Sequence, residues 1–222
     1  MSLRSRLTAF VSASAVAAGL TFTAAAPASA LSDGETADFL GQLTASYNDP
    51  LESANDGNPY DFDIVTKAVL LTGTDATLAG LDSFTLFAPN DRAFEVLAYR
   101  QGLLGDDFRF RSTVDEKAVT EALVEGLGAE AITTVLLYHA IPGAKADGEN
   151  ILTGFKNRRL ETATGQGLGV KVVSRSARYP LILLRDKDGR RYNDWVVPSK
   201  IDVVETDNAV VHGVSDVLLP NL

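Results

Sequence analysis

The sequence predicts an α+β domain in which helices come first and strands follow. Apolar side chains recur at helical spacing between residues 61 and 138. After Pro142-Gly143 the pattern changes to short β-type runs separated by Gly, Asp and Asn. This order does not suit alternating βαβ units, and no stretch of the chain repeats, so we expect one copy of one domain.

The first predicted helix begins near Asp61, which is its expected N-cap. Its apolar face carries Phe62, Val65 and Val69, and Gly73 is the expected stop. A short buried strand, SFTLFAP, follows at residues 83–89 and ends at a proline.

Two further polar residues mark helix starts. Asn90 is the expected N-cap of a helix that bears Ala93, Phe94 and Leu97. Residues 101–114 predict an irregular insert with a small hairpin. Asp115 opens the next helix, and the last one runs from Glu130 to Leu137, directly into Tyr138-His139.

Six β-type runs make up the second half of the domain. In order they are RRLETA, GVKVVSRS, YPLILLRD, RRYNDWVV, KIDVVET and AVVHGVSDVLLP. Asp188-Gly189 is a strong hairpin signal. The glycines of TGQGLGV, residues 164–170, precede a strand instead of a helix, which favours a hairpin turn over a phosphate-binding loop.

The N-terminal region divides into two segments before the domain. Residues 1–30 combine a basic start, an uncharged apolar stretch and a closing Ala-Ser-Ala, which together predict a secretory signal peptide. Residues 31–58 form a polar extension, and the folded domain is expected over 59–222. The chain has no cysteine, so no disulfide framework is possible, and no later apolar run is long enough to cross a bilayer. We expect a secreted or periplasmic monomer of bacterial type.

Charge is distributed unevenly along the chain. Without residues 1–30, 18 basic residues face 29 acidic ones, which argues against nucleic-acid binding. Between Lys156 and Lys200, however, eleven basic residues accompany four acidic ones. Two interpretations remain open: these bases complement acidic groups of the same chain, or they form a face that meets an anionic partner.

The two histidines, His139 and His212, both lie in apolar runs. Such a histidine is most often a buried, hydrogen-bonded core residue. A metal site built from both with a carboxylate stays open, although no ligand spacing supports it. Ser215 and Asp216 lie near His212, but the G-x-S-x-G elbow of a hydrolase is missing. We therefore predict no catalysis and no cofactor.

Three stretches in order resemble the fasciclin-type extracellular domain, FAS1. They are FTLFAPNDRAF with Phe87, Pro89, Asn90, Asp91 and Phe94; YHAIPG with Tyr138, His139, Pro142 and Gly143; and NAVVHGVSDVLLP with Asn208, His212, Leu218 and Pro220. Locally, Asn90 stands where the family usually has Thr, the segment before Tyr138 is longer than usual, and Gly213 replaces a β-branched residue.

The resemblance implies a wedge in which N-terminal helices pack on a predominantly antiparallel β-sandwich. It also implies a secreted, non-catalytic module that contacts a protein or an anionic glycan at the cell surface or in the matrix. The alternative is a carrier of a small apolar ligand in a cleft between strands and helices.

The resemblance further places the start of the Asn90 helix beside the tyrosine-histidine motif. From this placement we predict a hydrogen bond between His139 and the Asp91 carboxylate. Together with the charge distribution, the resemblance suggests a partner surface. The candidate residues are Tyr138, His139, Arg158, Arg159, Arg190 and Arg191.

Overall fold

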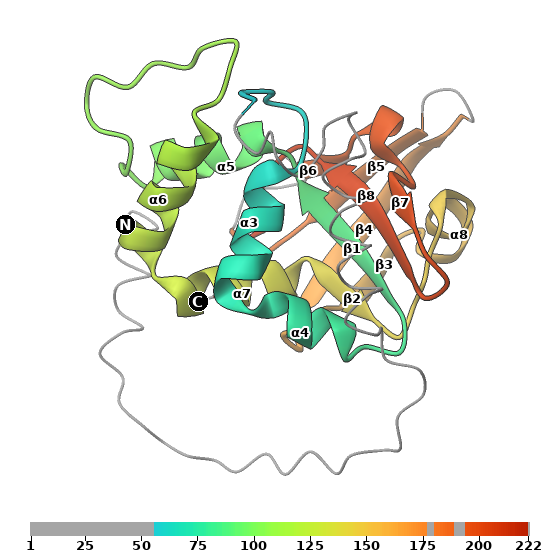
Figure 1. Ribbon diagram of the computed structural model, residues 1–222. Coiled ribbons are helices and arrows are strands. Elements are labelled where there is room, and N and C mark those ends of the chain that lie inside the picture. Colours follow the sequence, from blue (N-terminus) through green and yellow to red (C-terminus); the bar gives the residue numbers. More distant parts are fainter. Residues whose placement is uncertain (1–55, 177–179, 189–193, 222) are drawn as a thin grey trace.

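The computed structural model describes residues 56–176, 180–188 and 194–221. Figure 1 shows a layer of helices packed on one side of a strongly twisted sheet, and one further helix, α8, at the far side of the strands. The helices are α3 (Asp63–Thr72), α4 (Thr74–Ala79), α5 (Asp91–Arg100), α6 (Glu116–Leu127), α7 (Ala129–Tyr138) and α8 (Gly148–Gly154).

The described strands form one eight-stranded sheet in the order β2-β1-β8-β6-β5-β4-β3, with β7 added against β8. Their bounds are β1 (Phe84–Pro89), β2 (Ala140–Pro142), β3 (Arg158–Glu161), β4 (Gly167–Arg175), β5 (Pro180–Arg185), β6 (Asp194–Val196), β7 (Val204–Glu205) and β8 (Ala209–Val214). The pair β1 and β8 is parallel, and the other described pairs are antiparallel.

The two ends of the sheet approach each other. The Ala163 N–H, just after β3, donates to the Ala140 carbonyl of β2 over 2.8 Å. The sheet is therefore mixed and nearly closed, like a barrel. This corrects the expected sandwich, because twist accumulated over seven successive strands brings the edge strands together instead of leaving two stacked layers.

Local signals account for most helix ends. Asn90 accepts a hydrogen bond from the Ala93 N–H over 2.9 Å, and Asp115 accepts one from Ala118 over 3.0 Å, so both predicted N-caps are confirmed. Gly73 ends α3 at φ 66°, in the left-handed region that favours glycine. The predicted cap at Asp61 is wrong, because α3 begins at Asp63.

One predicted turn is present, and the hairpin predicted for the insert is not. Residues 162–166 form the expected hairpin turn between β3 and β4, with Gly165 at φ 74° and a 2.9 Å bond from Thr162 N–H to the Gln166 carbonyl. The hairpin expected in the insert 101–114 is wrong, since this segment contains no strand. The Asp188-Gly189 turn falls partly outside the described residues.

Buried side chains form two clusters. One lies among α3, α5, α6, α7 and alternate residues along β1 and β8. The other lies on the inner side of the curved sheet, where Phe87, Tyr138, Leu168, Ile182 and Leu218 meet. Because alternate residues of β4 and β5 are buried, the remaining residues of these strands face outward.

Candidate functional site

The three FAS1-like stretches come together in space, because β2, β1 and β8 are neighbours in the sheet. Phe87 lies opposite His212, and Phe84 pairs with Pro142 while its N–H donates to the Asn208 carbonyl over 3.0 Å. Of the motif residues, nine are buried, namely Phe87, Pro89, Asp91, Phe94, Tyr138, His139, His212, Leu218 and Pro220. Asn90 and Asn208 are half-buried, and Pro142 and Gly143 are exposed.

His139 is a buried link between two parts of the chain. Its Nε2 accepts a hydrogen bond from the Leu218 N–H over 2.9 Å, so the ring proton must lie on Nδ1, which donates to the Val135 carbonyl over 2.7 Å. Burial lowers the pKa of His139 from 6.5 to about 4. The histidine is therefore neutral and structural, as its apolar context predicted.

His212 also links two parts of the chain, but its ring is the other tautomer. Its Nδ1 accepts from the Asp202 N–H over 3.1 Å, so Nε2 carries the proton and donates to the Ala146 carbonyl over 2.8 Å. Burial also lowers its pKa. Since both nitrogens of each ring bond backbone groups, the two histidines do not offer ligands to a shared metal.

The predicted hydrogen bond between His139 and Asp91 is wrong. Asp91 instead accepts from the Ile64 N–H over 3.0 Å, and thereby joins the start of α5 to the start of α3. Burial, followed by the negative charge of Asp61, raises its pKa well above the usual value. The resemblance placed Asp91 near the tyrosine-histidine segment but did not specify its contact.

The partner surface also needs correction at Tyr138 and His139. Their exposed fractions are 0% and 1%, and the Tyr138 hydroxyl donates to the Gly167 carbonyl over 3.2 Å. A side chain so enclosed offers nothing to a partner. Arg158 and Arg159 are exposed on β3, whereas Arg190 and Arg191 lie outside the described residues.

A row of basic residues crosses the outer face of the sheet. The register pairs Arg159 of β3 with Gly169 of β4, and Gly169 in turn with Arg185 of β5. Directly paired residues point to the same face, so two guanidinium groups flank a position without a side chain. The result is a shallow trough with backbone as its floor and arginines as its walls.

This trough belongs to an open groove of about 540 Å³, here called the basic groove. Its lining residues are Asn157, Arg158, Arg159, Gly167, Gly169, Val170, Lys171, Arg185, Asp186 and Lys187. A Cβ on Gly167 would overlap the Arg159 side chain, so this glycine gives the arginine room to lie across the strand.

Part of the basic groove could have been predicted from the alternation of residues along β4, in addition to the count of charges. In GLGVKVV, alternate residues point to opposite faces of the strand. Gly167, Gly169 and Lys171 therefore lie on the outer face, while Leu168 and Val170 are buried on the inner face. Arg185 could not be added in the same way, because its place opposite Gly169 depends on the register between β4 and β5.

Apolar side chains border the basic groove on the same outer face. Val173, Leu181 and Trp195 have exposed fractions of 53%, 36% and 44%, and Trp195 pairs with Leu183 across β6 and β5. Cationic and apolar groups are therefore side by side on the outer surface of β4, β5 and β6.

An apolar cavity among α3, α5, α6 and α7 is too small to support the carrier alternative. Its volume is about 20 Å³, roughly that of a single water molecule. Its lining includes Phe94, Leu97, Leu123 and Leu136. It is a packing defect of the helical layer and could not accommodate a pigment or lipid.

The family model of the Fasciclin domain matches residues 60–220, which is most of the chain. The chain belongs to the fasciclin family. Domains of this family are adhesion-type modules, generally without enzymatic activity and typically extracellular.

Among solved structures, the chain is similar to a FAS1 domain pair from the insect cell adhesion molecule fasciclin I, at 16% identity and a TM-score of 0.48. The match covers 71% of this chain and 43% of the solved chain, so the present protein spans less than half of the solved domain pair. No curated protein matches the sequence. Among the described residues, no helix has the length and apolar character needed to cross a membrane.

Proposed function

We propose that this fasciclin domain is an exported, non-catalytic binding module, and that the outer face of β3, β4 and β5 binds an anionic polymer. The observation that carries the proposal is the cross-strand row Arg159, Gly169 and Arg185. Arginine is suited to this role because its planar guanidinium makes paired hydrogen bonds to carboxylate or sulfate-like groups.

The charge at the basic groove is opposite to that of the whole chain. The chain carries a net charge of −9, but five of the groove's ten lining residues are Arg or Lys. Its one acid, Asp186, is buried and accepts hydrogen bonds from the Leu219 and Asp188 N–H groups. Burial raises the pKa of Asp186 to about 7, so it opposes the bases only partly at neutral pH. A local field of this kind attracts anions to one face.

The form of the surface favours a glycan over a compact anion. The groove is open along the strands, and the exposed Trp195 and Leu181 lie on the same side of the sheet. Aromatic and aliphatic side chains pack against the C–H faces of sugar rings, while the arginines bind the acidic substituents. An acidic protein segment is the second candidate partner, which the same arginines would recognise.

Binding to polygalacturonate, a carboxylated glycan, tests the proposal against neutral dextran. We expect binding to polygalacturonate alone, and affinity should fall steeply as salt rises from about 20 to 300 mM, since exposed charges are screened. The double charge reversal Arg159→Glu with Arg185→Glu should lower the affinity at least about tenfold, a loss of roughly 1.4 kcal/mol or more.

The matched control is Arg111→Glu with Lys117→Glu, which changes the net charge equally at two exposed positions in and after the insert. This variant should bind almost as tightly as the wild type. Equal losses in both double variants would show that overall charge, and not the basic groove, governs binding.

A further inference from the structure

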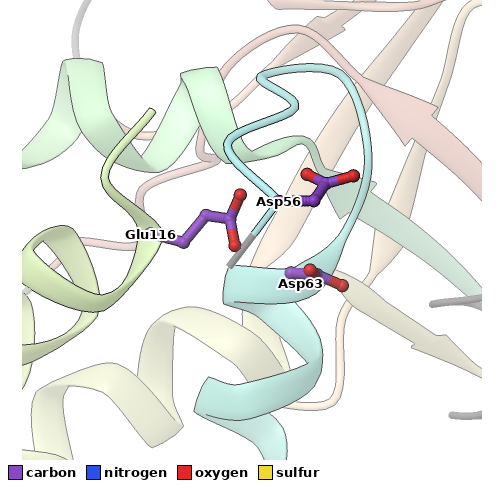
Figure 2. Close-up of side chains that lie close together, drawn as sticks. All are labelled: Asp56, Asp63 and Glu116. Carbon is purple, nitrogen blue, oxygen red and sulfur yellow. The ribbon is translucent and has the colours of Figure 1, made fainter. Parts of the chain in front are cut away.

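A cluster of carboxylates lies where the first turns of three helices meet. Asp63 opens α3, Asp91 opens α5 and Glu116 opens α6, while Asp61 precedes α3 by two residues. All four are buried, with exposed fractions of 0–2%. Figure 2 shows Glu116 extending from α6 toward the segment that carries Asp63 and the exposed Asp56.

Several of these oxygens are buried without a hydrogen bond. Among the described residues, no donor serves Asp61 Oδ1, Asp61 Oδ2, Asp91 Oδ2 or Glu116 Oε2. An unpaired buried carboxylate oxygen is costly, and the cost is far greater when the group is charged. Asp61 is the clearest case: it is only 1% exposed, no permanent donor of the described residues reaches either of its oxygens, and the group that it meets is the Asp91 carboxyl, which can donate only when protonated.

The carboxylates converge closely enough to share one ion. Asp61, Asp91 and Glu116 each place one oxygen so that all three oxygens lie within 4.8 Å of one another. Oxygens around a Ca²⁺ ion at 2.3–2.6 Å are separated by no more than about 5 Å. A second set, Asp56, Asp63 and Glu116, meets the same limit, so Glu116 is common to both.

An ion has a path to this cluster. Glu116, Asp56 and Asp115 line an open hollow of about 740 Å³ beside the insert. Among the described residues, the cation that lies against the cluster is Lys67, whose Nζ is 3.7 Å from Glu116 Oε2 and whose side chain is 24% exposed, while Arg109 and Arg111 line the hollow. One partly exposed ammonium does not balance four buried carboxylates, and its flexible stem can move toward solvent.

We propose that Asp61, Asp91 and Glu116 bind a hard divalent cation, with Ca²⁺ as the first choice. Carboxylate oxygens are the ligands that Ca²⁺ prefers, and seven or so oxygens complete its coordination, so water and the second acidic set supply the remainder. Bound in this position, the cation would join the segment before α3 to α5 and α6, and would stabilise the helical layer.

The competing explanation is that protons, and not a metal, neutralise the cluster. Burial raises the pKa of Asp61 to about 6 and that of Glu116 to about 7, and it raises the pKa of Asp91 well above its usual value. A group with a raised carboxyl pKa stabilises the fold at low pH, and this contribution is lost as pH rises through the folded pKa. Cation binding has the opposite pH dependence, because it requires ionised carboxylates.

Thermal unfolding of the whole protein at pH about 8, after EDTA treatment and dialysis, separates the two explanations. About 5 mM CaCl₂ should raise the Tm of the wild type by several degrees, and the rise should shrink at pH about 5.5. Isothermal titration with CaCl₂ should give a Kd below about 1 mM, which corresponds to about 4 kcal/mol.

The variants Asp61→Asn and Glu116→Gln preserve shape and remove one charge each. Both should lose the Ca²⁺-dependent rise, whereas Glu125→Gln on the exposed side of α6 should keep it. The proposal is overturned if wild-type Tm is unchanged by Ca²⁺, Mg²⁺ and Mn²⁺, or if Asp61→Asn and Glu116→Gln bind as the wild type does. If Glu116→Gln does not fold, Asp61→Asn alone decides.

Discussion

At the scale of single residues, the two histidines explain how distant parts of the chain are fastened. His139 connects α7 to Leu218, which lies 79 positions further along the chain, and His212 connects β8 to Ala146, 66 positions earlier. Each ring acts as one donor and one acceptor at the same time, which only the neutral form allows. Protonation would place an N–H against the N–H of Leu218 or of Asp202.

The contribution of the histidines to stability should therefore fall in mild acid, whereas the buried carboxyl groups with raised pKa values act in the opposite direction, so the difference between wild type and a histidine variant is the quantity to compare. The folded pKa of His139 is depressed to about 4 from 6.5, so its contribution is complete above pH 6.5 and is lost as pH falls toward 4. Between pH 7 and 5 the free energy of unfolding should drop by about 2 kcal/mol on account of His139. Chemical denaturation of wild type and His139→Ala across this range measures it.

The variant His139→Ala should cost about 1–3 kcal/mol at pH 7, since the Leu218 N–H and the Val135 carbonyl lose their partner. Between pH 7 and 5, the free energy of unfolding of this variant should depend less on pH than that of the wild type. Part of the remaining pH dependence comes from His212. A variant that keeps full stability but loses partner binding would contradict the structural role.

The sequence supported burial of His139 because its neighbours are apolar, and this prediction is confirmed. It did not predict the ring's partners, because the contact with Leu218 depends on where β8 ends in space. The Asp91 carboxylate illustrates the same limit. Its location at a helix start was local information, whereas its contact with Ile64 required the packing of α3 against α5.

At the scale of helices and strands, caps were the most predictable feature. Asn90 and Asp115 each bond an N–H three residues ahead, so the interaction is contained in the local sequence. The variant Asn90→Ala should lower the free energy of unfolding by about 1 kcal/mol, because the Ala93 N–H loses its acceptor. Urea denaturation measures the change, and Asn90→Asp, which retains an acceptor, should restore most of it.

The insert and α8 were less predictable. Residues 101–114 are held by aromatic contacts, since Phe110 lies 5.1 Å from Tyr99 and 5.2 Å from Phe108 between ring centroids. Such a cluster has no periodicity. The helix α8 is only seven residues long and contains two glycines, so its sequence carried little helical signal.

The glycine at position 167 offers a test of the basic groove that leaves charge unchanged. In Gly167→Ala the three atoms nearest the new Cβ all belong to the side chain of Arg159, which can move away. We expect the Tm to change by less than about 2 °C, while affinity for polygalacturonate falls several-fold, because Arg159 no longer lies across β4. Unchanged affinity would mean that the position of Arg159 is not important for binding.

At the scale of the whole molecule, charge and topology produce the proposed function together. The sequence showed that bases gather between residues 156 and 200, but the placement of Arg159 and Arg185 on one face depends on the order β5-β4-β3 and its register. Closure of the sheet was not predictable either, because it results from twist summed over all the strands. The helix-before-strand order, which depends only on local patterns, was correct.

Export is the expectation that determines where this function operates. Because Ala28-Ser29-Ala30 follows an uncharged apolar stretch, we predict cleavage after Ala30 and a mature chain that begins at Leu31. Expression in a secreting bacterial host, followed by N-terminal sequencing of the exported protein, checks this. Recovery of a chain that retains residues 1–30 would indicate a membrane-anchored protein instead.

We propose that this domain meets an anionic glycan at the outer face of β3, β4 and β5. The most direct test is an NMR titration of the ¹⁵N-labelled domain with an oligogalacturonate. We expect chemical-shift changes in the backbone amides of Arg159, Gly167, Gly169 and Arg185, and a similar response at the Trp195 indole. Changes confined to β1, β2 and β8, or changes that are equally large with a neutral oligosaccharide, would contradict glycan binding at this face.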